Sequence, residues 1–299
     1  MVMTRAMFQS LLEEGLRKVF FSSLKEKDMV YPKIFEVTDS KKRKESDQSI
    51  AGIGMLLEKL EGEPTVYDDM VEGYSVEYIH KTYSKGIRIT QEMIEDELYG
   101  QMNKRSAALA RSANYRLEYD HASLFNNANN TTVFTGGDTK ALLATDHPLF
   151  AAAGVTVSNT ASTDLSLAAL ETAELYFNTM VDDRNMLIPM RPKTLVIPPQ
   201  LKFDAWELLQ SGGKPGTADN DRNWFGGKYD IVVWDFLTDS DSWFLLSDKS
   251  YGAPISFKRT PISYKRDGDF DTDDLKMKCR TRYSFGFSDW RWVYGSMGG

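Results

Sequence analysis

The chain has 299 residues, of which 41% are hydrophobic and 26% are charged, so it can bury the core of one large domain or of two ordinary ones. Its formal net charge of −7 argues against a protein that coats nucleic acid with a basic surface. A single cysteine, Cys279, excludes internal disulfides and cysteine-rich zinc modules. No apolar run approaches the roughly 18 residues of a membrane span. We therefore expect a protein that works, or is made, in a reducing cytoplasm.

Residues 1–49 are predicted to form an arm, which consists of a short helix followed by extended chain. The helix, over residues 1–20, interleaves charged residues with five apolar ones: Phe8, Leu11, Leu12, Leu16 and Val19. This segment lacks the apolar block of a signal peptide. The arm has little core of its own, and we interpret its charged run at 41–47 as a solvated linker.

Residues 50–89 are predicted to form a long two-stranded hairpin. Tyr74, Val76 and Tyr78 alternate with polar residues, and the alternation resumes at Ile87 and Ile89, as in strands with one buried face. The tip is marked by a group of acidic residues, namely Asp68, Asp69 and Glu72. Because an isolated hairpin is only marginally stable in water, this hairpin is expected to pack against another protein surface.

The segment from Thr90 to Asn127 is predicted to be one long helix, because it lacks proline and repeats apolar residues every three, four or seven positions. This stripe comprises Ile94, Leu98, Met102, Leu109, Ala113, Leu117 and Leu124. Only Gly100 interrupts the helical pattern. The helix would be on the order of 55 Å long, which exceeds the diameter expected of a globular domain of this size. Such a helix predicts an elongated subunit whose flanks are covered by neighbours.

Residues 164–254 are predicted to contain a small α/β subdomain. A loop-rich stretch ends near Thr163, and the elements that follow are a helix over 165–181, a strand over 194–197, a helix over 198–209, a mobile loop over 211–222, and strands over 229–234 and 243–246. Strands that alternate with helices are typical of an α/β arrangement.

The last forty-five residues are rich in strands. From Leu275 to Phe287 the odd positions are mostly apolar, whereas four even positions are basic: Lys276, Lys278, Arg280 and Arg282. This alternation predicts a strand that packs one face on a core, which we expect to be the long helix. The basic face could be solvated, could touch nucleic-acid phosphates, or could receive an acidic partner surface.

The sequence contains few residues that could act in catalysis or bind a metal ion. His80 and His121 are expected to be surface or half-buried residues and not ligands. Asp146 and His147 place a carboxylate beside an imidazole, as acid/base pairs do, but adjacent side chains rarely orient each other and Pro148 favours a turn. The acidic stretch 267–274 lacks the spacing of a calcium loop and is interpreted as a hairpin turn. We interpret Cys279 as a buried residue that packs on the apolar face of a strand and is not a nucleophile. We expect no catalytic residue, no cofactor and no metal.

Short motifs follow one another in a defined order from residue 50 onward. Around the long helix they are Pro64–Asp69, Glu72-Gly73, Ile87–Thr90, Leu143–Leu149 and Asn159. Further on they are Leu165-Ser166, Leu170-Glu171, Pro192–Pro199, Ala205, Glu207–Leu209, Val232-Val233, Leu237–Asp239 and Asp241–Leu246. Each motif is structural and weak alone. In this order, over residues 50–299, they resemble the major capsid proteins of tailed bacteriophages, near the Mu-like head-subunit branch.

The resemblance implies an α+β fold of the tailed-phage major capsid type, in five parts. They are an N-terminal arm (1–49), an extended hairpin loop (50–89), a peripheral domain with the spine helix (90–163), an α/β axial domain (164–254) and C-terminal strands of the peripheral domain (255–299). It also implies a structural protein, not an enzyme, that self-assembles into hexamers and pentamers of an icosahedral shell around double-stranded DNA. Such a protein assembles in the host bacterial cytoplasm and resides in the virion.

The resemblance implies partners besides other copies of the chain. They are a portal, decoration proteins in some shells, and DNA that touches the inner face without sequence specificity; no membrane is implied. The chain starts too close to its arm to hold a scaffolding segment, so scaffold is expected to be a separate protein, to have been cleaved off, or to be unnecessary. No trio of lysine, asparagine and acid stands out, so we expect no covalent crosslink.

Our hypothesis for assembly is that the acidic hairpin of one subunit lies near the basic strand face of its neighbour. Glu61 also lies in this hairpin. The predicted contact residues are Glu63, Asp68, Asp69, Glu72, Lys276, Lys278, Arg280 and Arg282.

Three other interpretations remain open at this point. An encapsulin-like bacterial compartment would enclose protein cargo in place of DNA. A cytoplasmic hydrolase that uses Asp146 and His147 would be a compact monomer or dimer. A tail or connector protein of the virion would form a single cyclic ring.

Overall fold

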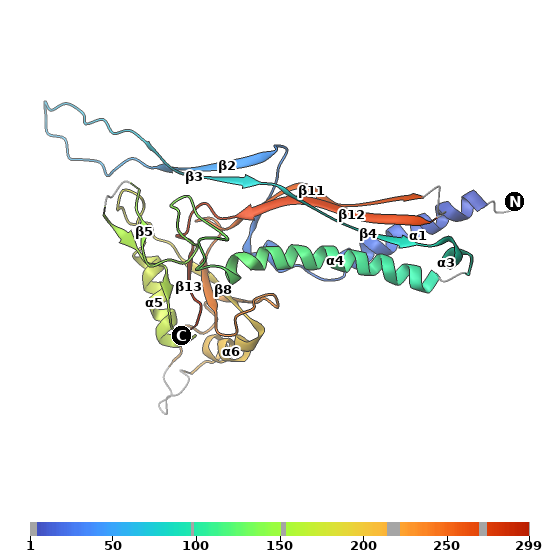
Figure 1. Ribbon diagram of the computed structural model, residues 1–299. Coiled ribbons are helices and arrows are strands. Elements are labelled where there is room, and N and C mark those ends of the chain that lie inside the picture. The colour runs from blue at the N-terminus through green and yellow to red at the C-terminus, as the bar shows by residue number, and fades with distance from the viewer. Residues whose placement is uncertain (1–4, 97–98, 151–153, 214–221, 269–273, 299) are drawn as a thin grey trace.

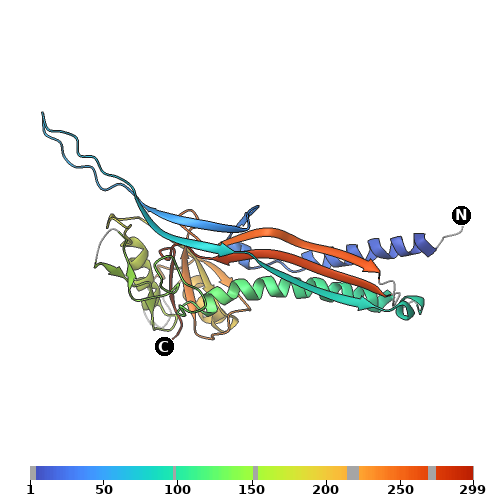
Figure 2. The same ribbon diagram turned by 45° about the horizontal axis from the view of Figure 1, so that its top comes forward.

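The computed structural model describes residues 5–96, 99–150, 154–213, 222–268 and 274–298. They form an elongated molecule in which a long helix lies under a sheet, a small α/β body lies at one end, and a hairpin reaches beyond that end (Figure 1). A second view shows that the hairpin continues from the sheet and not from the long helix (Figure 2). This architecture confirms the predicted α+β class. No helix in the described part of the chain is long and apolar enough to cross a bilayer.

We call the four-stranded sheet and the helices beneath it the beam. Its strand order is β1-β11-β12-β4. The strands are β1 (Glu36–Asp39), β4 (Lys81–Ile89), β11 (Ile255–Gly268) and β12 (Leu275–Gly286). In β12, Met277 and Cys279 are buried whereas Lys276 and Lys278 are exposed, so the alternation predicted for this strand is confirmed.

Two helices cover the buried face of this sheet, α1 (Arg5–Lys25) and α4 (Tyr99–Asn126). Met277 packs with Met102 of α4, and Cys279 packs with Leu109 of α4. The prediction that the apolar face of the last strands rests on the long helix is therefore confirmed. The beam is only two layers thick, so its outer sheet face and its outer helix face are both open to solvent.

The long helix is shorter than the sequence predicts. A separate helix, α3 (Gln91–Glu95), ends at Asp96, and α4 begins at Tyr99, with residues 97–98 outside the described part. Glu92, Glu95 and Asp96 lie within one turn, where like charges repel, and Gly100 costs about 1 kcal/mol relative to alanine in a helix. With 28 residues, α4 is about 42 Å long.

The arm contributes more to the core than the sequence predicts. Leu16 and Phe20 of α1 are fully buried against α4 and the sheet. The hydroxyl of Ser106 donates to the Leu16 carbonyl at 2.9 Å, and the Asn114 amide donates to the Leu24 carbonyl at 2.8 Å. The side chains of Phe8, Leu11 and Leu12 lie outside the described part. Leu16 and Phe20 therefore belong to the core of the beam and not to a separate core of the arm.

The hairpin is built from other strands than the sequence predicts. β2 (Lys44–Ala51), which begins inside the supposed linker, pairs antiparallel with β3 (Val71–Ile79). β4, the predicted second strand, pairs with β12 instead. The chain passes from β3 of the hairpin into β4 of the beam sheet at His80, a buried residue whose ring hydrogen-bonds to Ser40 and Ser284. The hairpin proper therefore spans residues 44–79, with 52–70 as its loop.

The α/β body contains a five-stranded sheet of order β7-β13-β10-β8-β9. Its elements are β7 (Thr160–Ala161), α5 (Leu167–Asn178), β8 (Pro192–Ile197), η1 (Pro199–Leu201), α6 (Lys202–Gln210), β9 (Asp230–Val233), β10 (Trp243–Ser247) and β13 (Val293–Ser296). A short pair beside it consists of β5 (His147–Pro148) and β6 (Thr156–Val157). The predicted α/β alternation is therefore present. Most of the predicted mobile loop, at 214–221, and of the acidic turn, at 269–273, lies outside the described part.

A buried carboxylate joins the arm, the long helix and the α/β body. Glu118 of α4 accepts hydrogen bonds from the backbone N–H of Val30 at 2.6 Å and from the indole N–H of Trp234 at 2.7 Å. Val30 precedes the short helix α2 (Tyr31–Ile34). Burial raises the pKa of Glu118, and the donated hydrogen bonds oppose that rise. The hydrophobic core is continuous across the same region, from Phe35 and Phe125 to Trp234.

All three histidines are buried, so the expectation of surface or half-buried positions is wrong. His121 of α4 stacks on Tyr31 with 4.2 Å between ring centroids. Its Nδ1 lies 2.6 Å from the Leu117 carbonyl and its Nε2 lies 2.8 Å from the Ser256 hydroxyl. Burial among these rings lowers the pKa of His121 from 6.5 to about 4.

Leu109→Ala is expected to destabilise the subunit by about 2–5 kcal/mol, because the cavity would lie between α4, α1 and the sheet. Urea denaturation of the unassembled subunit measures this change. Gln101→Ala, at an exposed position of the same helix, serves as the control and is expected to change stability by less than about 0.5 kcal/mol. A similar effect of both substitutions would contradict the described packing.

Stability of the subunit is expected to fall as the pH is lowered from 6.5 to about 4, because the unfolded chain then binds a proton that buried His121 resists. The contribution of this group is about 3 kcal/mol, from about 1.4 kcal/mol per pKa unit. It is fully present above pH 6.5 and is lost as the pH falls through the folded-state pKa. Denaturation curves of wild type and His121→Gln across this range measure the difference, and parallel pH profiles would contradict it.

Candidate assembly surfaces

The first candidate surface is the outer face of the beam sheet, which we call the basic face. Lys276, Lys278 and Arg280 of β12 are exposed on it. Paired positions extend it sideways, since Arg88 of β4 lies opposite Lys276 and Lys265 of β11 lies opposite Lys278. Within the described residues, Lys278 and Arg280 form no ion pair, so their charges are available to a partner.

A shallow depression of about 490 Å³ lies on the basic face, near the end of β11 that carries Arg266 and Asp267. Its floor is open because Gly86 has no side chain; a Cβ there would lie 3.2 Å from the Met277 carbonyl oxygen. Arg88, Lys265 and Lys278 are among the residues that line it. The lining also includes the exposed Asp267, so the depression is mainly but not entirely basic and could receive an acidic or polar side chain of a partner.

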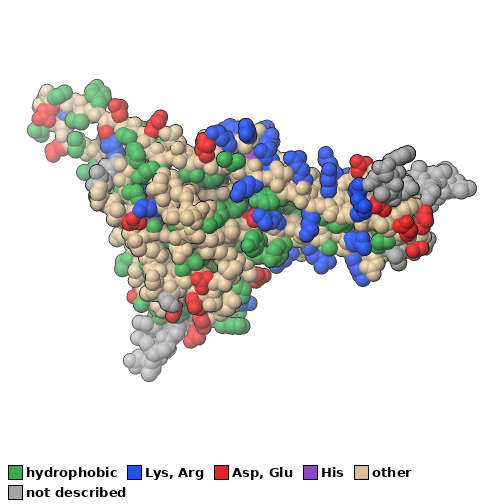
Figure 3. Space-filling view, viewed as in Figure 1, with side chains coloured by type: hydrophobic (Ala, Val, Ile, Leu, Met, Phe, Trp, Pro, Cys, Tyr) green, Lys and Arg blue, Asp and Glu red, His purple; other side chains and the backbone are tan. Residues whose placement is uncertain are grey.

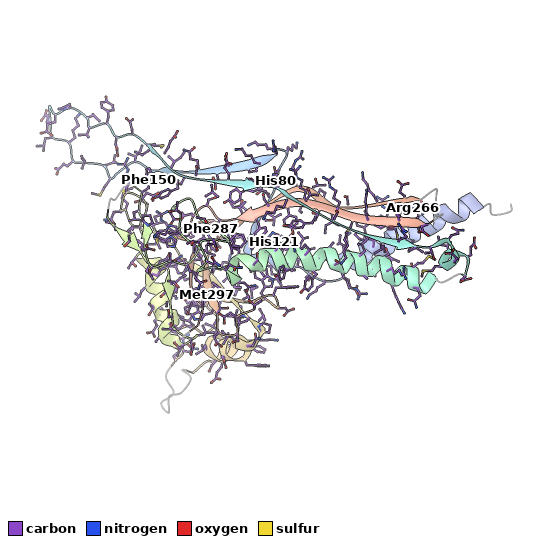
Figure 4. The ribbon with its side chains drawn as sticks, viewed as in Figure 1. His80, His121, Phe150, Arg266, Phe287 and Met297 are labelled. Atoms are coloured by element: carbon purple, nitrogen blue, oxygen red, sulfur yellow. The ribbon has the colours of Figure 1, made fainter. Side chains whose placement is uncertain are left out.

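Arg282 differs from the other three predicted basic residues. It is half-buried, and its Nε is enclosed without a hydrogen-bond partner in the described structure. It lies close enough to His80 to lower the pKa of that imidazole, together with the larger effect of burial. His80 lies where the hairpin joins the sheet, far from Arg266 near the other end of β11 (Figure 4). Arg282 therefore belongs to this junction and not to the open part of the basic face.

The second candidate surface is the hairpin loop 52–70, with the acidic residues predicted for it. Asp68 accepts the backbone N–H of Gly54 across the loop at 2.9 Å, which holds its pKa below the usual value, as does Arg184 at 3.4 Å. Arg184 also donates to the Asp69 carbonyl at 2.9 Å. Glu63 and Glu72 are exposed. Arg184 thus ties the loop to the body of its own subunit, a contact that the sequence did not indicate.

The same loop exposes a concentration of apolar side chains that sequence reasoning missed. Leu56 and Tyr67 are each 92% exposed. The full set is Ile53, Met55, Leu56, Leu57, Leu60, Val66, Tyr67 and Met70. Green side chains cover this tip in the space-filling view (Figure 3). The unbroken run from Met55 to Leu57 in a segment without helical or strand structure was the available signal.

One subunit does not bring the two surfaces together. The hairpin extends from one end of the beam and the basic face extends toward the other end (Figure 1). Asp68 reaches Arg184 of its own chain, and none of the described acidic residues of the loop is paired with β12. The two surfaces could therefore meet only between copies of the chain.

The hydrolase interpretation lacks the geometry it needs. His147 is fully buried, stacks on Trp290, and hydrogen-bonds through Nδ1 to Asp138 at 2.6 Å. Asp146 is exposed and pairs with Lys140 instead. His147 lies in β5 and not in the predicted turn. Adjacent residues thus point to different environments, and a substrate could not reach the imidazole.

Neither Cys279 nor the acidic side chains of the described residues form a second candidate for a catalytic or metal site. The Cys279 thiol is buried in the beam core, and burial raises its pKa, so a reactive thiolate is disfavoured. Among the described residues, no three histidine, cysteine, aspartate or glutamate side chains are grouped so that they could hold a metal ion.

Comparisons with known proteins agree with this absence of catalytic geometry. Residues 73–296 match the sequence model of the phage capsid protein family. The fold is similar to that in the procapsid of bacteriophage JBD30, with a TM-score of 0.54, 15% identity, and coverage of 98% of this chain and 76% of that one. No curated protein sequence matches the chain significantly.

Two further structures share the fold. The capsid of cyanophage P-SCSP1u matches with a TM-score of 0.56, 12% identity, and coverage of 91% of this chain and 89% of that one. A virus-like particle from Pyrococcus furiosus matches with a TM-score of 0.54, 12% identity, and coverage of 95% and 98%. At such identities these likenesses establish the fold alone, whereas the family match covers most of the sequence. The chain belongs to the phage capsid protein family and is a structural component of the virion capsid, not an enzyme.

Proposed function

We propose that this capsid protein is the major head subunit, which closes into an icosahedral shell of hexamers and pentamers around double-stranded DNA. The observation that carries the proposal is the exposed apolar loop 52–70, because a soluble monomer rarely leaves so many large hydrophobic side chains in water. Burial of such surface contributes roughly 25 cal/mol per Å², which favours assembly over a free subunit.

The division of the chain into five parts remains our proposal, with two changes in its boundaries. The arm (1–49), hairpin loop (50–89), peripheral domain (90–163), axial domain (164–254) and returning strands (255–299) keep the order expected of the family. Strand pairing moves β2 into the hairpin and β4 into the peripheral sheet. We also propose the Mu-like branch, on the motifs quoted above, and a separate scaffold, a portal and decoration proteins as partners.

The position of the hairpin supports its predicted partner surface. It continues from the sheet side of the beam in both views (Figures 1 and 2), so it stands at the level of the basic face. Copies that share one orientation in a shell would therefore present hairpin and basic face to each other. The acidic residues would set the register and the apolar residues would supply most of the free energy.

The likeness to the Pyrococcus furiosus particle keeps an encapsulin-like compartment as the second candidate. Both candidates use the same fold. They differ in what the shell encloses, which is DNA in one and protein cargo in the other.

The purified protein is expected to form closed shells or capsomers that electron microscopy resolves directly. Particles from infected or producing cells are expected to contain nuclease-protected DNA and no stoichiometric cargo protein. A single cyclic ring would favour a tail or connector protein, cargo protein would favour the compartment, and a stable globular monomer at high concentration would refute both candidates.

Lys278→Glu combined with Arg280→Glu is expected to reduce shell yield at least about tenfold, because two reversed charges turn attraction into repulsion at the interface. The free energy of unfolding of the subunit should change by less than about 1 kcal/mol, since both side chains are exposed. Light scattering and electron microscopy measure assembly, and urea denaturation measures folding.

The matched control is Lys278→Arg with Arg280→Lys, which keeps both charges and is expected to assemble normally. Adding Glu63→Lys and Asp69→Lys to the double reversal should restore part of the yield if the hairpin is the partner. Normal shells from the double reversal alone would show that this pairing is wrong.

A further inference from the structure

Two arginine side chains at the junction of the hairpin and the sheet lack a partner within the described part of the subunit. Arg259 of β11 and Arg282 of β12 are half-buried, and the Nε of each is enclosed without a hydrogen-bond partner. Neither guanidinium group forms a hydrogen bond or an ion pair with any described residue. Partly buried charge is costly unless it is paired, so the arrangement indicates a partner from outside the subunit.

Strand pairing brings the two arginines together. Arg282 lies opposite Thr260 of β11, and the register shifts at this point, so Arg259 is the extra residue of a β-bulge beside Arg282. Burial lowers the pKa of His80, and Arg282 and Arg259 lower it further, so both charges act on the same imidazole. The pair of arginines therefore lies where the chain passes from the hairpin into the sheet.

The segment between β1 and β2 adds positive charge at the same place. Lys41 and Arg43 are exposed, and the segment is held at the junction because the Ser40 hydroxyl lies 3.1 Å from Nε2 of His80. Blue side chains gather near this junction in the space-filling view, and His80 is labelled there in the view with side chains (Figures 3 and 4). A diffusing anion would thus be attracted to the two arginines.

The carboxylates beside this segment do not neutralise the arginines. Glu45 accepts a hydrogen bond from Ser40 at 2.7 Å and pairs with Lys42 at 3.2 Å. Glu77 of β3 pairs with Lys44. Asp47, which lies on the same side of β2 as Glu45, forms no ion pair with either arginine in the described structure. The two positive charges of the bulge are therefore uncompensated.

The number and the shape of these groups select among anions. A guanidinium group presents a planar fork of N–H groups that matches the oxygens of a phosphate. A free phosphate group carries a charge of about −1.5 to −2 at pH 7, which neutralises two arginines at once. A phosphodiester of nucleic acid carries a single negative charge, as does a carboxylate, and would leave one arginine unpaired.

We propose that Arg259 and Arg282 form a binding site for a small phosphate anion at the junction of the hairpin and the beam. The ion accepts hydrogen bonds from both guanidinium groups and so connects β11 to β12 beside the segment that leads into β2. Occupancy of the site stabilises the position at which the hairpin leaves the sheet. The inference goes beyond the proposed function and does not rest on it, because the site lies within one subunit.

Isothermal titration calorimetry of the full-length, unassembled chain with inorganic phosphate tests the site, at an ionic strength held constant with chloride. Wild type is expected to bind a single phosphate per subunit. Arg259→Gln with Arg282→Gln is expected to weaken binding at least about tenfold, because both charge-assisted contacts are lost. Arg282→Lys keeps the charge but not the fork, so its affinity should lie between those of wild type and the double variant.

The matched control is Lys265→Gln with Lys278→Gln. These lysines are exposed and lie opposite each other on the same two strands, so the control removes the same charge. About 13 Å of strand separates Lys278 from Arg282, which exceeds the screening length of about 10 Å at 0.1 M salt. The control is expected to bind phosphate within about twofold of wild type. Equal weakening by both double variants would show diffuse attraction to the whole basic face and would overturn the assignment.

Thermal denaturation gives a readout that a merely structural role of the arginines would not produce. In chloride, the variant with both arginines replaced should be at least as stable as wild type, because the two side chains bond to no described residue. Phosphate is expected to raise the Tm of wild type and not that of the variant. A variant that is much less stable than wild type in chloride would show that the arginines bond within the subunit, and would overturn the proposal.

Two other occupants are distinguished by the same titration. Binding of a peptide with the sequence of residues 59–72, but not of phosphate, would assign the arginines to the acidic hairpin of a neighbouring copy. Binding of duplex DNA, but not of phosphate, would assign them to nucleic acid. Either result overturns the phosphate site. Failure of the chain to form shells would refute the proposed function alone, because these measurements use the single subunit.

Discussion

The structure depends on one packing arrangement, in which a single layer of two helices covers one face of a long, narrow sheet. Met277 and Cys279 of β12 meet Met102 and Leu109 of α4, and Phe20 of α1 fills the space beside them. Lys276, Lys278 and Arg280 on the outer sheet face and Lys104 and Arg111 on the outer helix face are exposed to solvent. A body two layers thick buries less of its surface than a compact domain of the same length. The stability of the subunit and its function therefore both depend on large faces that are exposed in the single subunit.

The remaining parts are attached to this beam with different strength. Glu118 connects α2, α4 and the α/β body through buried hydrogen bonds, in a core that is continuous across the same region. Such a junction is rigid, because removal of one partner would leave a buried polar group unsatisfied. The hairpin loop, by contrast, is held by Arg184 at its surface and exposes its apolar side chains. A rigid body with an adaptable loop is suited to subunits that pack in several similar environments.

The chemistry of the chain serves this structural role. All three histidines are buried and engaged in hydrogen bonds or ring stacking, and the cysteine is part of the core. The charged side chains are instead segregated by surface. Basic side chains lie on the outer faces of the sheet and of the helices, and acidic side chains lie in the hairpin. The function thus resides in faces and not in a cleft.

The sequence by itself determined the elements whose pattern is local: the alternation of β12, the apolar stripe of α4, the α/β alternation, and the family, because each rests on periodicity or short motifs. Tertiary structure alone decided which strands pair. β4 alternates like a hairpin strand but hydrogen-bonds to β12, almost two hundred residues away, and β2 takes its place beside β3. It also decided that His80 and His121 are buried. Strand pairing and burial depend on contacts between distant segments. The alternation of apolar residues along a strand indicates which of its faces is buried, but not which strand lies beside it.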